Sequence, residues 1–162
     1  MDQPANGYAA WDAARAREIV AGFEPAQHHL LPVLHALQAT FGYVDREAEP
    51  LIAEAFNISR ADVHGVVTFY HDFRSAPPGR HHLRVCRAEA CQARGSDALT
   101  ADIEAGLGIA IDSTSADGAV TFGAVYCLGL CASGPAIMLD GQLVGRVEPG
   151  EGARRVVEAC QQ

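Results

Sequence analysis

The chain has 162 residues, of which 49% are hydrophobic and 20% charged, as expected of a small globular protein with one or two domains. Its formal net charge is −8, and neither half is basic: residues 1–79 hold 5 Arg and 10 acidic residues, residues 80–162 hold 7 Arg and 10. This balance argues against nucleic-acid binding. Apolar stretches are too short for a membrane span and no secretory leader is recognisable, so we expect a cytoplasmic protein. Its cysteines should then stay reduced and available to metals.

Residues 1–76 show helical periodicity and predict an N-terminal domain built as a small helical bundle, with about ten loose residues at its start. Gly42 is a plausible stop for one helix, and Asp45 a candidate cap for the next. Ser59 and Asp62 have the spacing of a capping box. The four expected helices are Ala13–Phe23, His29–Thr40, a segment from Asp45 to Phe56, and a segment from Ser59 to Tyr70.

The sequence Ala76-Pro77-Pro78-Gly79 interrupts this pattern and is the best domain boundary in the chain. The following domain, residues 80–162, alternates strands and helices, so the expected class for the whole chain is α+β. Two strands are expected to end at cysteines, and Asp140-Gly141 is a strong hairpin signal. The expected elements are the strands Leu83–Val85, Val120–Tyr126, Ala136–Leu139 and Gln142–Val147, and the helices Asp97–Leu107 and Glu151–Cys160.

Four of the five cysteines form two pairs, each of which begins where an expected strand ends. Four residues separate Cys86 from Cys91, and three separate Cys127 from Cys131. Between the pairs lie 35 residues, enough for a crossover helix that brings two strand ends to one edge of a sheet. Four convergent thiolates indicate either a structural Zn²⁺ or an iron–sulfur cluster.

The spacing within the pairs favours a [2Fe–2S] cluster over zinc. Zinc ribbons and knuckles use tighter turns around a single ion, whereas a two-iron core is broader and needs two thiolates on each iron. Gly129 and Gly134 would let backbone N–H groups approach the sulfurs. A non-redox scaffold stabilised by zinc stays open as the alternative.

Other interpretations of the cysteines and their neighbours are weaker. His81-His82 do not have the spacing of Rieske ligands, and no Cys-x-x-Cys dithiol is present. Cys160 stands alone on the last expected helix and should be a buried apolar residue. Three arginines near the first pair could offset the cluster's negative charge or could simply be solvated: Arg84, Arg87 and Arg94.

The two cysteine pairs and the residues around them resemble the thioredoxin-like [2Fe–2S] ferredoxins, and more narrowly the 24-kDa (E) subunit of respiratory NADH dehydrogenase and its relatives. The resemblance runs from about residue 15 to the end of the chain. Within the family, Cys86 to Gln92 and the short length look most like the gamma subunit of soluble, molybdenum-dependent, NAD-linked formate dehydrogenases. The segments that carry it are Val85–Cys91, Asp117-Gly118, Cys127–Cys131, Gly134–Ala136, Leu30–Tyr43 and His64–Tyr70 with Phe73.

This resemblance implies a thioredoxin-like fold for the second domain and a flavoprotein partner that binds FMN and NAD(H). The cluster would exchange single electrons with that FMN, which receives electrons from formate oxidised at a partner's molybdenum centre. FMN, NAD, the molybdenum cofactor and further Fe–S clusters would belong to partner subunits. The 24-kDa (E) subunit of NADH:quinone oxidoreductase and the diaphorase subunit of an NAD-reducing hydrogenase are the nearest alternatives. A freestanding ferredoxin is a third.

The remaining motifs suggest no catalysis by this chain alone, because we find no nucleophile system, phosphate-binding glycine loop or paired acid and base. His64 and His71 would share a face of the fourth helix, where packing or an interface is a better explanation than a metal. Phe69 is expected in the core of the bundle. Pro135 follows Gly134 at a position where thioredoxin-like folds often have a cis-proline, although an ordinary trans turn is the commoner outcome.

Overall fold

The computed structural model describes residues 7–161. The chain divides into two compact units, Met1–Pro77 and Pro78–Gln162. Each unit has its own apolar core. The expectation of a loose start falls partly on residues 1–6, outside the described residues, while Ala9 donates its N–H to the carbonyl of Thr40. In the described part of the chain, no helix has both the length and the hydrophobicity that crossing a bilayer requires.

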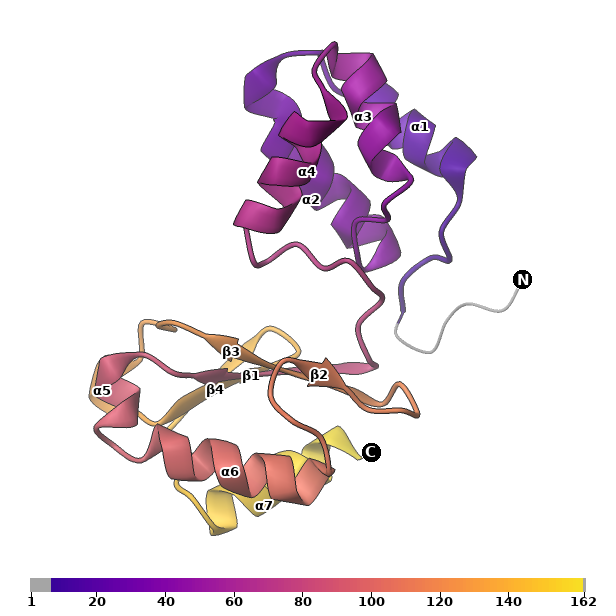
Figure 1. Ribbon diagram of the computed structural model, residues 1–162. Helices are drawn as coiled ribbons and strands as arrows, with labels where there is room; N and C mark the ends of the chain where they lie inside the picture. The colour runs from indigo at the N-terminus through magenta and orange to yellow at the C-terminus, as the bar shows by residue number, and fades with distance from the viewer. Residues whose placement is uncertain (1–6, 162) are drawn as a thin grey trace. The chain divides into compact units, whose positions relative to one another are not determined.

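The first unit is made of helices that bury one apolar stripe each against a common core (Figure 1). Its largest fully buried side chains are Phe41, Leu34, Leu37 and Ile52. Gly42 ends α2 in the left-handed conformation, as its position in the sequence predicted. The helical elements are α1 (Ala13–Ala21), the 3₁₀ turn η1 (Gln27–His29), α2 (Leu30–Phe41), α3 (Ala48–Phe56) and α4 (Arg60–Phe69).

The predicted capping box at the start of α4 is confirmed. Ser59 Oγ accepts from the N–H of Asp62, and the Asp62 carboxylate accepts from the N–H of Ser59. The prediction that Asp45 caps the third helix is wrong: α3 begins at Ala48 after Glu47, and Asp45 Oδ1 instead accepts from the N–H of Glu47. The Asp45 carboxylate therefore stabilises the turn before the helix.

The second unit is a five-stranded sheet in the order β2-β3-β1-β4-β5, and α6 and α7 lie side by side against one face (Figure 1). β1 and β3 are parallel, and the other neighbouring strands are antiparallel. The parallel pair requires a crossover, which α6 supplies. The elements are β1 (His81–Cys86), α5 (Glu89–Gln92), α6 (Ser96–Leu107), β2 (Ser113–Thr114), β3 (Val120–Val125), the 3₁₀ turn η2 (Cys131–Ser133), β4 (Ala136–Leu139), β5 (Gln142–Gly145) and α7 (Glu151–Cys160).

Two features of the second unit go beyond the sequence-based expectations. The short elements α5 and β2 were not predicted, because runs of four and two residues are too short to show a period. The Gly134–Pro135 bond is cis, a choice that the sequence left open. The predicted hairpin at Asp140-Gly141 is confirmed, with Leu139 paired to Gln142 across the turn.

Candidate functional site

The two parallel central strands bring the cysteine pairs to one edge of the sheet. β1 ends at Cys86, which lies opposite Val125, the last residue of β3. Cys91 follows Cys86 on the short helix α5, and Cys127 comes two residues after the end of β3. Because parallel strands end at the same edge, this register confirms the expectation that both pairs begin there.

The four thiols lie close enough to interact with one another. The Sγ atoms of Cys127 and Cys131 are 3.7 Å apart. Cys86 and Cys91 lie close enough for each thiol to affect the pKa of the other, and Cys86 and Cys131 are near enough for the first to raise the pKa of the second. The structure thus places all four sequence-predicted ligands in one group.

The spacing of the exposed thiols fits a tetrahedral metal centre. Two thiolates bonded to one tetrahedral ion at about 2.3 Å are about 3.8 Å apart, close to the Cys127–Cys131 separation of 3.7 Å. Among residues 7–161, no group of three or more His, Cys, Asp or Glu side chains surrounds a single metal position. Arg87 Nε, next to Cys86 in the chain, is buried and lacks an acceptor in the described residues. Two thiol pairs, rather than one group around a single metal position, fit a cluster with two thiolates on each iron.

The two pairs differ in their exposure to solvent. Cys86 and Cys91 are 2% and 1% exposed and pack with Ala136, whereas Cys127 and Cys131 are exposed. Gly129 donates its N–H to Cys127 Sγ at 3.4 Å, at a left-handed φ of 78° that glycine tolerates without strain. One side of the site is therefore closed to water, and the other side is open to solvent.

Burial and hydrogen bonding act in opposite directions on Cys86. Burial alone would raise the pKa of this thiol, but N–H groups of Ala88, Cys127 and Leu128 and the Cys91 thiol donate to it, and its net pKa is lowered. Burial, followed by the hydrogen bond to Cys86, raises the pKa of Cys91. Cys86 is thus the member of the buried pair better prepared to be a thiolate before any metal binds.

Several residues that the sequence did not single out hold the cysteine loops together. Ser96 is fully buried and donates from Oγ to the carbonyl of Cys86 at 2.5 Å, which joins β1 to the start of α6. A Cβ at Gly145 would lie 2.8 Å from the carbonyl oxygen of Ser133, and one at Gly134 would lie 3.1 Å from Cys91 Sγ. Both glycines therefore allow the loop that follows Cys131 to pack closely.

The three arginines near the first pair have different roles. Arg94 donates from a terminal guanidinium nitrogen to the carbonyl of Ala132 at 3.2 Å, directly after Cys131. Arg87 forms an ion pair with Asp97 of α6 at 3.0 Å. Arg84 lies within β1, where its Nε contacts His82 Nε2 at 3.3 Å. Arg94 is thus the arginine that links the loops of the two cysteine pairs.

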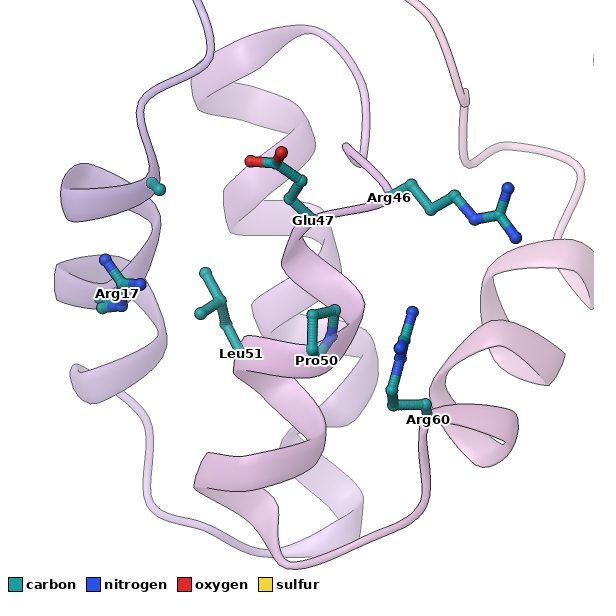
Figure 2. A pocket seen from close by; sticks show the side chains of 7 residues that line it. Arg17, Arg46, Glu47, Pro50, Leu51 and Arg60 are labelled. Carbon is teal, nitrogen blue, oxygen red and sulfur yellow. The ribbon is translucent and has the colours of Figure 1, made fainter.

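The first unit has a concave surface among its helices, which encloses a volume of about 470 Å³ (Figure 2). It is bordered by the start of α1, the first turn of α3 and the start of α4. The lining residues, none of which is a cysteine, are Ala13, Arg17, Arg46, Glu47, Pro50, Leu51 and Arg60.

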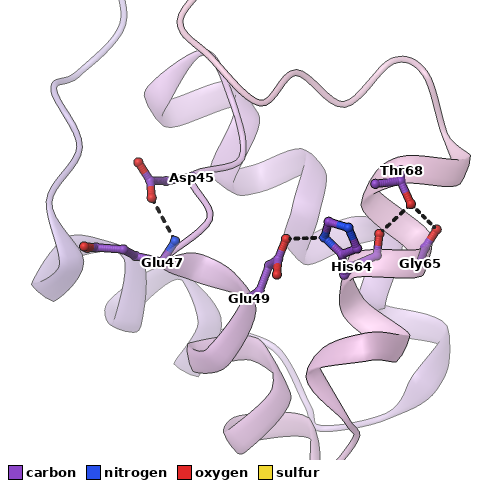
Figure 3. Close-up of polar contacts among 6 residues, drawn as sticks. All are labelled: Asp45, Glu47, Glu49, His64, Gly65 and Thr68. Carbon is purple, nitrogen blue, oxygen red and sulfur yellow. Dashed lines mark hydrogen bonds and ion pairs between the residues drawn. The ribbon is translucent and has the colours of Figure 1, made fainter.

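His64 and His71 are not brought together on one helix face. His64 Nδ1 lies 2.8 Å from Oε1 of Glu49, whose side chain is 8% exposed (Figure 3). The expectation that His71 shares a helix face with His64 is wrong, because α4 ends at Phe69 and Tyr70 is extended. The expectation that Phe69 fills the core is also wrong, since it is 71% exposed. Phe69 lies about a third of a turn around α4 from the buried Val63 and therefore faces away from the core.

Comparison with known proteins identifies a family for nearly the whole chain. The model of the thioredoxin-like [2Fe–2S] ferredoxin family matches residues 16–161. The E subunit of the NADH-quinone oxidoreductase of Pseudomonas aeruginosa is 36% identical over 137 residues, which are 85% of this chain and 82% of that protein. The HndA subunit of the NADP-reducing hydrogenase of Solidesulfovibrio fructosivorans is 33% identical over 138 residues, covering 83% of this chain and 81% of the relative.

Solved structures agree on the fold. The NAD⁺-reducing [NiFe]-hydrogenase in its air-oxidised state contains a chain that superposes on 82% of this one with a TM-score of 0.69 and 24% identity. The H₂-reduced state gives a TM-score of 0.71 over 85% of the chain with 23% identity. This chain spans only 23% of the length of either hydrogenase chain. Together with the family match, this likeness confirms the predicted α+β class and the thioredoxin-like [2Fe–2S] fold.

Proposed function

Because the chain belongs to the thioredoxin-like [2Fe–2S] ferredoxin family, we propose that it is the electron-transfer subunit of a cytoplasmic, NAD-linked formate dehydrogenase complex. Members of this family carry one [2Fe–2S] cluster, which accepts and releases single electrons. In this proposal the cluster is held by the four paired cysteines, Cys86, Cys91, Cys127 and Cys131.

The observation that carries the ligand assignment is the convergence of these four thiols at the ends of two parallel strands. The buried pair excludes water from one side, and the exposed pair leaves the other side open to an electron partner. That partner is an FMN- and NAD-binding diaphorase subunit, which contacts this chain directly. Its flavin passes electron pairs to NAD⁺, while this chain's residues only hold a one-electron site.

The choice of formate dehydrogenase rests on the segment Cys86 to Gln92, which resembles the gamma subunit of that enzyme. A molybdenum- and Fe–S-containing formate dehydrogenase subunit then belongs to the same complex. The curated relatives support two alternatives equally: the 24-kDa (E) subunit of an NADH-quinone oxidoreductase and the corresponding subunit of a hydrogenase.

The test is to purify the complex through a tag on this chain and to analyse its metals, subunits and activity. We expect two iron and two sulfide per chain, a paramagnetic signal on reduction, and co-purification of a flavoprotein and a molybdenum protein that together reduce NAD⁺ with formate. One zinc without iron or sulfide would contradict the electron-transfer role. If quinone-reductase or hydrogenase subunits co-purify in place of the molybdenum protein, the assignment to a formate dehydrogenase complex is rejected. The electron-transfer role of this chain would still hold.

A further inference from the structure

Three arginines of the first unit gather around the concave surface of Figure 2 although the unit is acidic. Residues 1–77 contain 5 Arg and 10 acidic residues, and three of those five arginines line this one surface: Arg17, Arg46 and Arg60. Within residues 7–161, none of the three forms an ion pair. By contrast, Arg15 on α1 is paired with Glu18 at 2.8 Å. The surface is therefore a local concentration of unneutralised positive charge.

One carboxylate, that of Glu47, also lines this surface and offsets one of the three positive charges. Glu47 accepts a hydrogen bond from Trp11 Nε1 at 3.0 Å, which orients one carboxylate oxygen toward the indole. Glu47 is also the N-cap residue of α3, without a capping hydrogen bond from its side chain. The three arginines outnumber Glu47, so the concave surface keeps a net positive charge.

An apolar strip separates the charges. In Figure 2, Arg46 and Arg60 lie on one side of Pro50 and Leu51, and Arg17 of α1 lies on the other. Leu51 and Arg17 also border a second hollow of about 300 Å³ along α1 and α3, whose other lining residues are Val20, Ala21, Glu54 and Ala55. Because the two hollows share these two residues, we treat them as one groove, in which three arginines face Glu47 and Glu54. Positive groups spread along an apolar groove match an extended ligand better than a single phosphate.

We propose that this groove, called here the arginine groove, binds an acidic segment of a partner subunit. Two or more carboxylates of that segment pair with Arg17, Arg46 and Arg60, and an apolar side chain between them packs on Leu51 and Pro50. The forked guanidinium suits carboxylates because it can donate two parallel hydrogen bonds. The inference rests on the proposed function only in requiring that the chain works inside a complex.

The first test reverses charge in the purified complex. Arg17→Glu, Arg46→Glu and Arg60→Glu are combined, and subunit dissociation is measured over a range of salt concentrations. We expect the dissociation constant of the triple variant to be at least about tenfold higher than that of the wild-type complex. The affinity of the wild-type complex should fall as the salt concentration rises. Arg15→Glu is the control for Arg17→Glu measured alone, because it makes the same charge change on α1 outside the groove. Thermal unfolding and the visible cluster spectrum of each variant establish that it is folded and loaded.

The second test identifies the occupant. A photoreactive amino acid replaces Arg46, and the cross-linked partner peptide is sequenced by mass spectrometry. We expect a stoichiometric subunit and a peptide with at least two Asp or Glu flanking an apolar residue. A cross-link to a segment without acidic residues, or equal effects of Arg15→Glu and the triple variant, would overturn the proposal.

The free subunit is also titrated with inorganic phosphate and pyrophosphate. Saturable binding that the triple variant loses, together with unchanged dissociation of the complex, would show a small-anion site and reject docking. These outcomes do not depend on which complex is isolated. If the complex contains no molybdenum protein, the proposed function fails, while the cross-linked peptide still decides the role of the arginine groove.

Discussion

Cys127 and Cys160 are both in the second unit and allow a controlled test of the ligand assignment. Cys127 is exposed beside Cys131, whereas Cys160 is fully buried in the core and its pKa is raised to about 11, chiefly by burial. We predict that Cys127→Ala abolishes the visible absorbance and the reduced-state paramagnetic signal, because metal binding and loop order are coupled. Cys160→Ala should retain both at a cost of about 1 kcal/mol in unfolding free energy. Equal spectra in the two variants would reject the assignment.

Arg94 is the residue by which we expect the protein to tune the cluster without ligating it. It holds the carbonyl of Ala132 next to Cys131 and brings a positive charge to a group that becomes more negative on reduction. We predict that Arg94→Gln lowers the midpoint potential, while Arg94→Lys, which keeps the charge, lowers it less. Redox titration followed by absorbance measures this. Arg154→Gln, at an ion pair with Glu151 on α7, is the control and should leave the potential unchanged.

For single residues, the sequence predicted which side chains could bind a metal but not which residues contact one another. The cysteine pairs were recognisable because their spacing and the preceding apolar strands are local features. The hydrogen bond from Ser96 to Cys86 and the link between Arg94 and Ala132 depend on loop paths. Phe69 is exposed because, six residues after the buried Val63, it lies off the apolar stripe of α4.

Among the elements, α3 and α4 are joined by a polar contact whose strength can be measured. The Glu49 carboxylate is almost fully buried and His64 Nδ1 lies 2.8 Å from it (Figure 3). We predict that His64→Ala lowers the unfolding free energy by about 1–3 kcal/mol, because it leaves a buried carboxylate without its partner. His71→Ala, beyond the helix end, should cost much less. In chemical denaturation, the Glu49→Ala/His64→Ala double variant should lose less than the sum of the two single variants.

Elements with strong local signals were predicted well, and those without them were not. The capping box of Ser59 and Asp62, the stop at Gly42 and the turn at Asp140-Gly141 all act through neighbouring residues. The short helix α5 is held instead by its position between Cys86 and α6. The order of the strands also follows from long-range pairing, which periodicity does not encode.

At the scale of the whole molecule, the position of the boundary between the two units decides which residues support the cysteine-containing unit. Sequence placed a break between residues 76 and 80, and the structure assigns Pro78 and Gly79 to the second unit. Gly79 donates its N–H to Thr121 Oγ1 at 2.7 Å, and a Cβ there would lie 2.7 Å from the backbone carbon of Val120. Gly79 therefore packs directly on β3. The proline pair lies where the two units meet in the chain, and this contact shows on which side the glycine belongs.

We propose that the second unit is a domain that folds and binds its cluster alone, since its core and all four candidate ligands lie within residues 78–162. A fragment of residues 78–162 should therefore show the same visible and paramagnetic spectra as the full chain. A fragment that begins at residue 80 lacks the hydrogen bond from Gly79 to Thr121 and should unfold at a lower temperature. Thermal denaturation followed at the cluster absorbance measures both. Loss of the spectrum in the longer fragment, with the full chain intact, would show that cluster binding requires the helical unit.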